Sequence, residues 1–459
     1  MNEQVAANPL GTERVGKLMI RYAIPSIISI VVNSLYNMVD QIFIGQGVGY
    51  LGNAATNIIL PLTSILLALG MMIGDGTASY MSLNLGKGRS QAAAYGVGNA
   101  VTLTVGVSVF LLVLFELFLE PLCHLFGATE GNLPYALEYG SIIVLGFPFA
   151  MIDGAFGSII RADGRPKVSM VGLLIGCITN IILDPIFIYA LHMGVRGAAL
   201  ATVISQAISG IWVVRFLAGK QSKLRLRRSR LRPRWSIMTP VLALGVSPFI
   251  MQSTEALLNI SFNASLQRYG GDVAVAAMTV ASTVMQIVWI PTQGLGQGAQ
   301  PIISYNYGAR NPDRVRAAFK ALLGVSMTVM LTFWALVQLF PQFFIRIFNS
   351  DPELLETAVW TLRVYTAVVG LFGIQMAVQQ TFTAIGKAKA ALFIACLRKV
   401  ILLIPLIFIL PHFFENKVFA VFLAEPVSDF ISVTAAAITF YFVFRPAMKE
   451  LEAPQEKEI

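Results

Sequence analysis

Twelve long runs of apolar residues constrain this chain more than any other feature of its sequence. A helix that crosses a bilayer needs about 20 apolar residues, and each run reaches that length. Only α-helices and closed barrels satisfy every backbone polar group in lipid, and these runs are too long and too uniformly apolar for barrel strands. The sequence therefore predicts an all-α polytopic membrane protein with spans at 18–44, 53–79, 93–119, 136–160, 168–191, 197–218, 239–266, 274–302, 317–340, 356–384, 390–411 and 417–444.

Composition agrees with this class of protein. Of the 459 residues, 56% are hydrophobic and only 12% are charged, whereas about a quarter of a soluble domain is charged. The first run is too long for the core of a signal peptide, so we expect the N-terminus to be retained. The three cysteines, Cys123, Cys177 and Cys396, are scattered and indicate neither a disulfide framework nor a metal site.

The basic residues predict the orientation in the membrane. With a cytoplasmic N-terminus, 25 of the 33 Lys and Arg residues fall in cytoplasmic segments or in the first turn of the span that follows. The positive-inside rule then places both termini in the cytoplasm of a cell (inner or plasma) membrane protein. The most basic segment, 220–234, is expected to lie near anionic lipid rather than to bind nucleic acid.

The two halves of the chain resemble one another at an offset of 222 or 223 residues. Pro25 matches Pro248, Gly86 matches Gly308, and "GRPK" at 164–167 matches "GKAK" at 386–389. An even number of spans in each half makes this a parallel repeat, a common plan among transporters. The expected organisation is an N-terminal lobe (1–219), a basic cytoplasmic loop (220–236) and a C-terminal lobe (237–459).

Polar side chains mark particular faces of the spans in the first half, where acidic residues are rare and usually functional. In the first run one helical face carries Asn33, Tyr36, Asn37 and Asp40. Asn180 and Asp184 lie one turn apart in the fifth run, Asp153 lies in the fourth, and Thr202 lies in the sixth. Such oxygen atoms suit a hard cation or two carboxylates that share a proton.

Structural interpretations of these residues stay open. Asp40 and Asp184 could instead form hydrogen bonds between helices, and the same holds for Asp153. Asp75 lies near a helix end and is expected to be a solvated or capping residue. Pro185 lacks an N–H, which frees a carbonyl one turn earlier and makes the helix bendable.

The second half carries a different polar stripe, with Gln252, Glu255, Asn259 and Asn263 in the seventh run. The repeat places Gln375 where Asp153 stands, so Glu255 is the lone deep acid expected early in the second lobe. Arg398 and Lys399 lie in the eleventh run, where they are expected either to extend toward the cytoplasmic surface or to pair with an acid or a substrate anion. We treat this stripe, with Gln375 and Arg398, as a candidate polar or substrate site.

Several motifs, in order along the repeat, resemble those of the multidrug and toxic compound extrusion (MATE) family. They are "NMVDQIFIG" in the first run, "LGKG" after the second, "RADGRPK" after the fourth, "NIILDPIFI" in the fifth, "GVRGAALAT" entering the sixth and "LRKVILLIPL" in the eleventh. The resemblance extends over about residues 14–445 and is nearest to the bacterial and archaeal branch of the family.

The resemblance implies a V-shaped, two-lobed exporter that works by alternating access, driven by H⁺ or Na⁺ bound in the N-terminal lobe. The implied cation site comprises Asp40, Asn180, Asp184 and Thr202, with a backbone carbonyl near Ala198, and Tyr36 and Tyr139 around it. Another branch uses a seventh-helix Glu, which Glu255 matches, and a tenth-helix Asp. Gln375 stands where that second acid is expected, which argues against a second cation site.

The expected function is therefore secondary antiport that exports amphipathic cationic compounds, by a monomer that needs no cofactor beyond its coupling ion. A flippase for lipid-linked sugars is the nearest rival, but it should show a strongly basic central cavity. A facilitator-type transporter lacks support because "NLGKGRSQAAA" (84–94) does not supply that family's DRxGRR-like loop. No nucleophile–base pair, metal motif or convincing nucleotide loop favours an enzyme.

Overall fold

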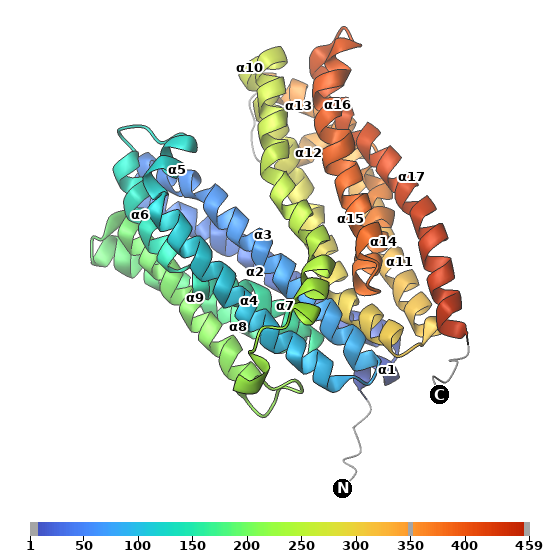
Figure 1. Ribbon diagram of the computed structural model, residues 1–459. Coiled ribbons are helices and arrows are strands. Elements are labelled where there is room, and N and C mark those ends of the chain that lie inside the picture. Colours follow the sequence, from blue (N-terminus) through green and yellow to red (C-terminus); the bar gives the residue numbers. More distant parts are fainter. Residues whose placement is uncertain (1–7, 348–351, 454–459) are drawn as a thin grey trace. The chain divides into compact units, whose positions relative to one another are not determined.

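A computed structural model describes residues 8–347 and 352–453, and every regular element within those ranges is a helix (Figure 1). Ten of these helices are long and apolar enough to cross a membrane, and the bent pair α6–α7 adds an eleventh span. The 74-residue helix α10 (Trp235–Gly308) would be about 110 Å long if it were straight. It is broken at Gly271, where φ is 63° and ψ is −159°, so it contains two of the expected spans. The twelve predicted segments therefore all have helical counterparts.

Five of the first six spans end within three residues of their predicted limits, whereas the second continues seven residues beyond its predicted end, to Gly86. The break in the fourth falls at Gly146, where α6 and α7 meet at 55°, and the fifth ends in the π-helical segment η1. These elements are α2 (Val15–Gly47), α3 (Tyr50–Gly86), α4 (Ser90–Leu117), α6 (Leu133–Leu145), α7 (Phe147–Ala162), α8 (Pro166–Pro185), η1 (Ile186–Ala190) and α9 (Gly194–Ala218).

The second half repeats this plan after α10. The eleventh span of the chain is interrupted by a second π-helical segment, η4, which lies between two α-helical pieces. The elements are α11 (Pro312–Leu339), α13 (Pro352–Tyr365), η3 (Val369–Leu371), α14 (Phe372–Ala384), α15 (Ala388–Cys396), η4 (Leu397–Leu403), α16 (Ile404–Ile409), η5 (Leu410–His412) and α17 (Lys417–Glu452). Four short helices outside the spans are α1 (Pro9–Thr12), α5 (Leu119–Leu125), η2 (Arg228–Arg230) and α12 (Pro341–Arg346).

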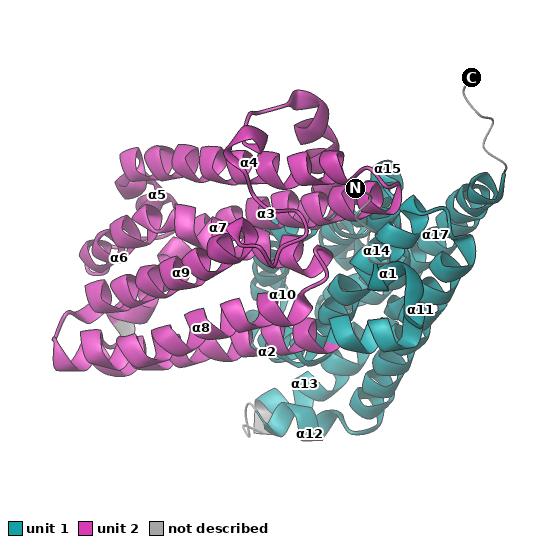
Figure 2. Cartoon of the chain, turned by 90° about the horizontal axis from the view of Figure 1, so that it is seen from below, with its two compact units in different colours: residues 1–23, 250–459 teal, residues 24–249 magenta. Residues whose placement is uncertain are grey.

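The chain packs as two compact units, each with its own apolar core (Figure 2). Unit 2 comprises residues 24–249, and unit 1 comprises residues 1–23 and 250–459. The chain passes from one unit to the other beside Pro25 and Pro248, the prolines that the repeat relates. Unit 1 therefore includes the first turns of α2, which continues in unit 2, and unit 2 includes the first turns of α10, which continues in unit 1. The lobe boundaries expected at 219 and 237 stay a prediction.

Glycines allow very close helix crossings at related positions in the two units. In unit 2, a Cβ added to Gly76 of α3 would overlap the Val241 carbonyl of α10, and one added to Gly245 would overlap the Met72 carbonyl. In unit 1, a Cβ on Gly298 of α10 would lie 2.7 Å from the Cα of Ala23 on α2. Each crossing involves a helix segment next to one of the prolines where the chain changes unit.

Candidate functional site

The end of α2 and the segment after α8 are held together in unit 2. The Tyr189 hydroxyl of η1 donates a hydrogen bond of 3.0 Å to the Phe43 carbonyl of α2, and the two rings meet edge to face. Gly47 permits this approach, because a Cβ there would collide with Ile188. These contacts bring the helical turn that carries Asp40 next to the turn that carries Asp184.

Four of the predicted site residues, Asp40, Asn180, Asp184 and Thr202, gather at this junction, and all four are buried. The Asn180 amide donates to Asp184 Oδ1 and to Thr202 Oγ1, each at 3.3 Å. The carboxyl groups of Asp40 and Asp184 lie within hydrogen-bond reach of one another. Helices α2, α8 and α9 thus each contribute a side chain to one cluster of oxygen atoms.

Three oxygen atoms of this cluster lack a hydrogen-bond donor among the residues that the structure describes. They are Asp40 Oδ1, Asn180 Oδ1 and Asp184 Oδ2. Buried acceptors are normally satisfied, and two adjacent carboxylates repel one another unless a positive charge lies between them. A proton shared by the two carboxyl groups, or a small hard cation, would satisfy this arrangement.

Further polar groups surround the cluster. Tyr36 lies within hydrogen-bond reach of Thr202, and buried Tyr139 of α6 has Asp40, Asp184 and Tyr36 as its ionisable neighbours. Gln41 donates to Asp40 Oδ2 at 3.5 Å and accepts from Thr56 at 3.1 Å. Gln41 was not among the residues predicted from sequence, although it directly follows Asp40. Ala198 is buried one turn before Thr202 on α9.

Three other predicted residues of the first half lie apart from these contacts. Asn33 and Asn37 are exposed on α2, and within the described residues neither side chain has a hydrogen bond. Asp153 of α7 accepts a hydrogen bond from Ser209 of α9, whose hydroxyl also lies 2.9 Å from the Gly172 carbonyl. The carboxylate of Asp153 therefore belongs to a separate contact between α7, α8 and α9.

The expectation for Asp75 is wrong. Its carboxylate is buried in the interior of α3 and accepts a hydrogen bond of 2.6 Å from Ser158. Arg161 donates to the same serine at 2.7 Å and interacts electrostatically with Asp75. Helix α3 continues for three turns beyond Asp75, to Gly86, so the side chain is neither solvated nor at a cap.

Of the two roles expected for Arg398 and Lys399, the structure shows pairing with acids and not extension to the membrane surface, because both side chains are buried and paired. Arg398 of η4 bonds to Glu425 and Asp429 of α17 at 2.6 Å each, and its guanidinium lies 4.4 Å from the Phe372 ring centre. Lys399 points to α10 instead, where it pairs with Glu255. Two consecutive cationic residues of η4 thus form ion pairs with two different helices, α17 and α10.

Sequence reasoning missed Glu425 and Asp429, so Glu255 is not the lone deep acid of the second half. A signal was present, since "EPVSD" (425–429) sets two acids one turn apart in an apolar span. Gln375 is buried and accepts a hydrogen bond of 2.7 Å from Ser432. Gln252 and Glu255 are partly exposed, while Asn259 and Asn263 are exposed on α10.

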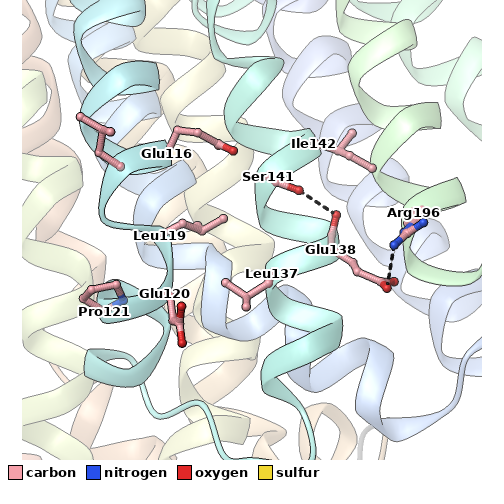
Figure 3. A pocket seen from close by; sticks show the side chains of 10 residues that line it. Glu116, Leu119, Glu120, Pro121, Leu137, Glu138, Ser141, Ile142 and Arg196 are labelled. Carbon is pink, nitrogen blue, oxygen red and sulfur yellow. Dashed lines mark hydrogen bonds and ion pairs between the residues drawn. The ribbon is translucent and has the colours of Figure 1, made fainter.

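A hollow of about 700 Å³ is lined by residues of α4, α5, α6 and α9, none of which belongs to either cluster (Figure 3). Its charged lining comprises Glu116, Glu120 and the exposed ion pair of Glu138 with Arg196. No group of three or more His, Cys, Asp or Glu residues in the described part of the chain could hold a metal ion. The candidate cation site in α2, α8 and α9 therefore depends on amide and hydroxyl oxygens as well as carboxylates.

A multi-pass helical protein with two related halves and buried polar sites has the architecture of a membrane transporter. The chain belongs to the MatE family, whose model matches residues 25–186 and again 248–409. The two matches cover equivalent parts of the two halves, as the internal repeat predicts.

Known proteins resemble the chain over almost its whole length. Multidrug export protein MepA of Staphylococcus haemolyticus is 26% identical over 423 residues, which cover 91% of this chain and 92% of that protein. A crystal structure of MATE in the bent conformation superposes with a TM-score of 0.91 at 22% identity, covering 97% of this chain and 98% of the other. The MATE multidrug transporter DinF-BH gives a TM-score of 0.87 at 35% identity, with coverage of 95% and 98%.

Proposed function

We propose that this transporter is a multidrug exporter that exchanges amphipathic, cationic organic compounds for H⁺ or Na⁺. The observation that carries the proposal is the buried oxygen cluster of Asp40, Asn180, Asp184 and Thr202, with its adjoining carboxyl groups. The cluster has three acceptors without a donor in the described chain. It is therefore suited to take up and release one positive charge.

Binding of a cation to this cluster drives export because it changes the favoured distance between α2 and α8. With the cation bound, Asp40 and Asp184 attract a common positive centre, which draws α2 toward α8. Without it, the two carboxylates repel one another across the same contact. Pro25 in α2 and Pro185 at the end of α8 make both helices deformable.

The names of the relatives support the substrate class. MepA is a multidrug export protein, and DinF-BH is a multidrug transporter. The buried charges of the second half argue against a flippase for lipid-linked pyrophosphates. Arg398 and Lys399 are both engaged by carboxylates, so neither offers uncompensated positive charge to a phosphate group.

The remaining elements of the proposal are the orientation in the membrane, the oligomeric state and the partners. Both termini and the loop 220–234 lie in the cytoplasm, since most basic residues then face inward. The protein acts as a monomer in the cell membrane, with small organic molecules as substrates, lipid around it, and no bound cofactor, nucleic acid or catalytic reaction.

Transport in proteoliposomes tests this function. A proton gradient and a sodium gradient are imposed separately, and efflux of several cationic dyes is followed. We expect one of the gradients to drive efflux in the parent protein and neither to do so in Asp184→Asn or Asp40→Asn. Asp313→Asn is the matched control, because this carboxylate is 91% exposed. Normal gradient-driven efflux in Asp184→Asn would exclude the site, and full ion dependence in Asp40→Asn would make that residue structural.

A further inference from the structure

The Lys399 ammonium group occupies a small site made of oxygen atoms from α10. It donates a hydrogen bond of 2.8 Å to the Met251 carbonyl and pairs with the Glu255 carboxylate. These two acceptors lie one helical turn apart, on the same face of α10. A carboxylate next to a backbone carbonyl is a ligand set for any cation, and here the cation is part of the chain.

The two partners differ sharply in their access to solvent. The Lys399 side chain is 2% exposed, whereas the Glu255 side chain is 47% exposed. A partly exposed carboxylate within a membrane span normally faces a water-filled path rather than lipid. Part of the Glu255 carboxylate therefore stays accessible to a ligand while Lys399 is paired with it.

The charges around the pair show why Glu255 is the carboxylate left for a ligand. Arg398 holds Glu425 and Asp429, and all three of these side chains are buried. Together with Lys399 the four buried groups carry two positive and two negative formal charges. Glu255 adds one further negative charge at the accessible edge of the cluster. A second cation arriving at Glu255 would thus meet uncompensated negative charge.

The segment η4 is what delivers Lys399 to this position. Arg398 and Lys399 are consecutive, yet their side chains bond to α17 and α10 respectively. Wider π-helical turns frequently occur at functional sites. The Lys399 side chain approaches from the protein interior, so withdrawal of its ammonium group would leave both Glu255 and the Met251 carbonyl available.

We propose that Glu255 and the Met251 carbonyl form a recognition site for organic ammonium groups, and that Lys399 is a tethered cation that competes with the substrate for it. The proposal rests on the proposed function, because it takes exported cations as the natural competitors. It adds a substrate contact in the second lobe, separate from the coupling site of Asp40 and Asp184.

Competition predicts opposite effects for the two members of the pair. Lys399→Ala removes the internal competitor and should tighten binding of a monocationic dye about tenfold. Glu255→Gln removes the carboxylate and should weaken it about tenfold, as expected for one close charge interaction. If the ion pair were purely structural, both variants should bind the dye more weakly, because either change leaves a partner unpaired.

The first experiment is fluorescence polarisation on purified full-length protein in detergent. The probes are a cationic rhodamine ester and its zwitterionic free acid, which share one ring system. Lys389→Ala is the matched control, since Lys389 is an exposed lysine on the preceding helix α15. We expect the affinity for the cationic ester to rise in Lys399→Ala and to fall in Glu255→Gln. The affinity for the zwitterion should change less in both variants. Weakened binding of the ester in both variants would overturn the proposal.

The second experiment covers the case in which Lys399→Ala folds poorly. Alanine lacks three carbons and the ammonium of lysine, and n-propylammonium supplies those atoms. Lys399→Ala should unfold on the order of 5 °C below the parent, and n-propylammonium should restore most of that loss. The neutral analogue 1-propanol should restore none. Equal stabilisation of Lys399→Ala and Lys389→Ala by n-propylammonium would contradict a vacated ammonium site.

These measurements are independent of ion coupling. If gradient-driven export fails while the opposite affinity shifts are found, the ammonium site stands and the proposed antiport does not. If export proceeds normally and both variants bind the ester more weakly, the antiporter stands and the tethered-cation proposal is excluded.

Discussion

Replacing Arg398 with methionine would leave two buried carboxylates without their cation. Glu425 is 5% exposed and Asp429 is 1% exposed, and each bonds to the guanidinium at 2.6 Å. Methionine preserves much of the side-chain volume beside Phe372 but supplies no charge and no donor. The variant therefore isolates the electrostatic contribution of the arginine to the stability of unit 1.

Removing one partner of a buried ion pair typically costs about 3–5 kcal/mol, because the remaining charge stays desolvated. The shift in midpoint is about 2–4 °C per kcal/mol for a cooperative unit of about 150–250 residues, the size range of unit 1. We therefore expect Arg398→Met to lower the unfolding midpoint on the order of 10 °C. Adding Glu425→Gln and Asp429→Asn should recover more than half of this loss.

Thermal unfolding of detergent-purified protein, followed by tryptophan fluorescence, measures the effect. Arg196→Met is the control, since its ion pair with Glu138 (Figure 3) has both side chains exposed and should contribute less than about 1 kcal/mol. A loss for Arg398→Met no larger than that of the control would refute the assignment of a buried ion cluster. A triple variant no more stable than Arg398→Met would show that the loss is not due to unpaired carboxylates.

Two further predictions concern unit 2. Gly245→Ala should sharply reduce the yield of folded protein, because the added Cβ would overlap the Met72 carbonyl. Gly106→Ala is the control, since a Cβ there would have no atom within 4 Å. Size-exclusion chromatography measures the yield, which should be unchanged in the control. Burial raises the pKa of the Asp163 carboxyl from 3.8 to about 6, against the hydrogen bond from the Lys223 backbone. The folded state then holds the proton more tightly, so stability falls by up to about 3 kcal/mol as pH rises from about 4 to about 6. Asp163→Asn should flatten that part of the pH profile of the unfolding midpoint, and an unchanged slope would contradict this origin.

The helical spans could be predicted because hydropathy is a local property, and the structure confirms all twelve as helical segments. The breaks within them were less visible. Gly146 and Gly271 interrupt helices, yet a glycine by itself does not mark a break. A glycine in an apolar helix is equally compatible with a straight helix, a close crossing or a break, and only packing decides among them.

The first-lobe cluster was accessible to sequence reasoning because its members follow helical periodicity. Asn180 and Asp184 lie one turn apart, and they do share a hydrogen bond. The same periodicity also assigned Asn33 and Asn37 of α2 to the site, but these two residues are exposed while Asp40 is buried. Periodicity identifies a common face of one helix, but the contacts of η1 cover only the end of that face.

The second-lobe cluster was harder to predict because helix geometry there is irregular. In a regular α-helix consecutive residues project about 100° apart, and the π-helical turn in η4 changes that angle around Arg398 and Lys399. Their partners also lie far away in sequence, on α10 and α17. Charge pairs of this kind require tertiary structure to be identified.

The central claim is that Asp40 and Asp184 together bind the coupling cation, and infrared difference spectroscopy tests it most directly. Protonated and ionised carboxyl groups absorb at different frequencies, so the pair can be followed during pH or sodium jumps on purified protein. We predict a carboxyl signal in the parent that changes with the coupling ion and is absent from both Asp184→Asn and Asp40→Asn. An identical ion-dependent carboxyl signal in the parent and both variants would contradict the claim.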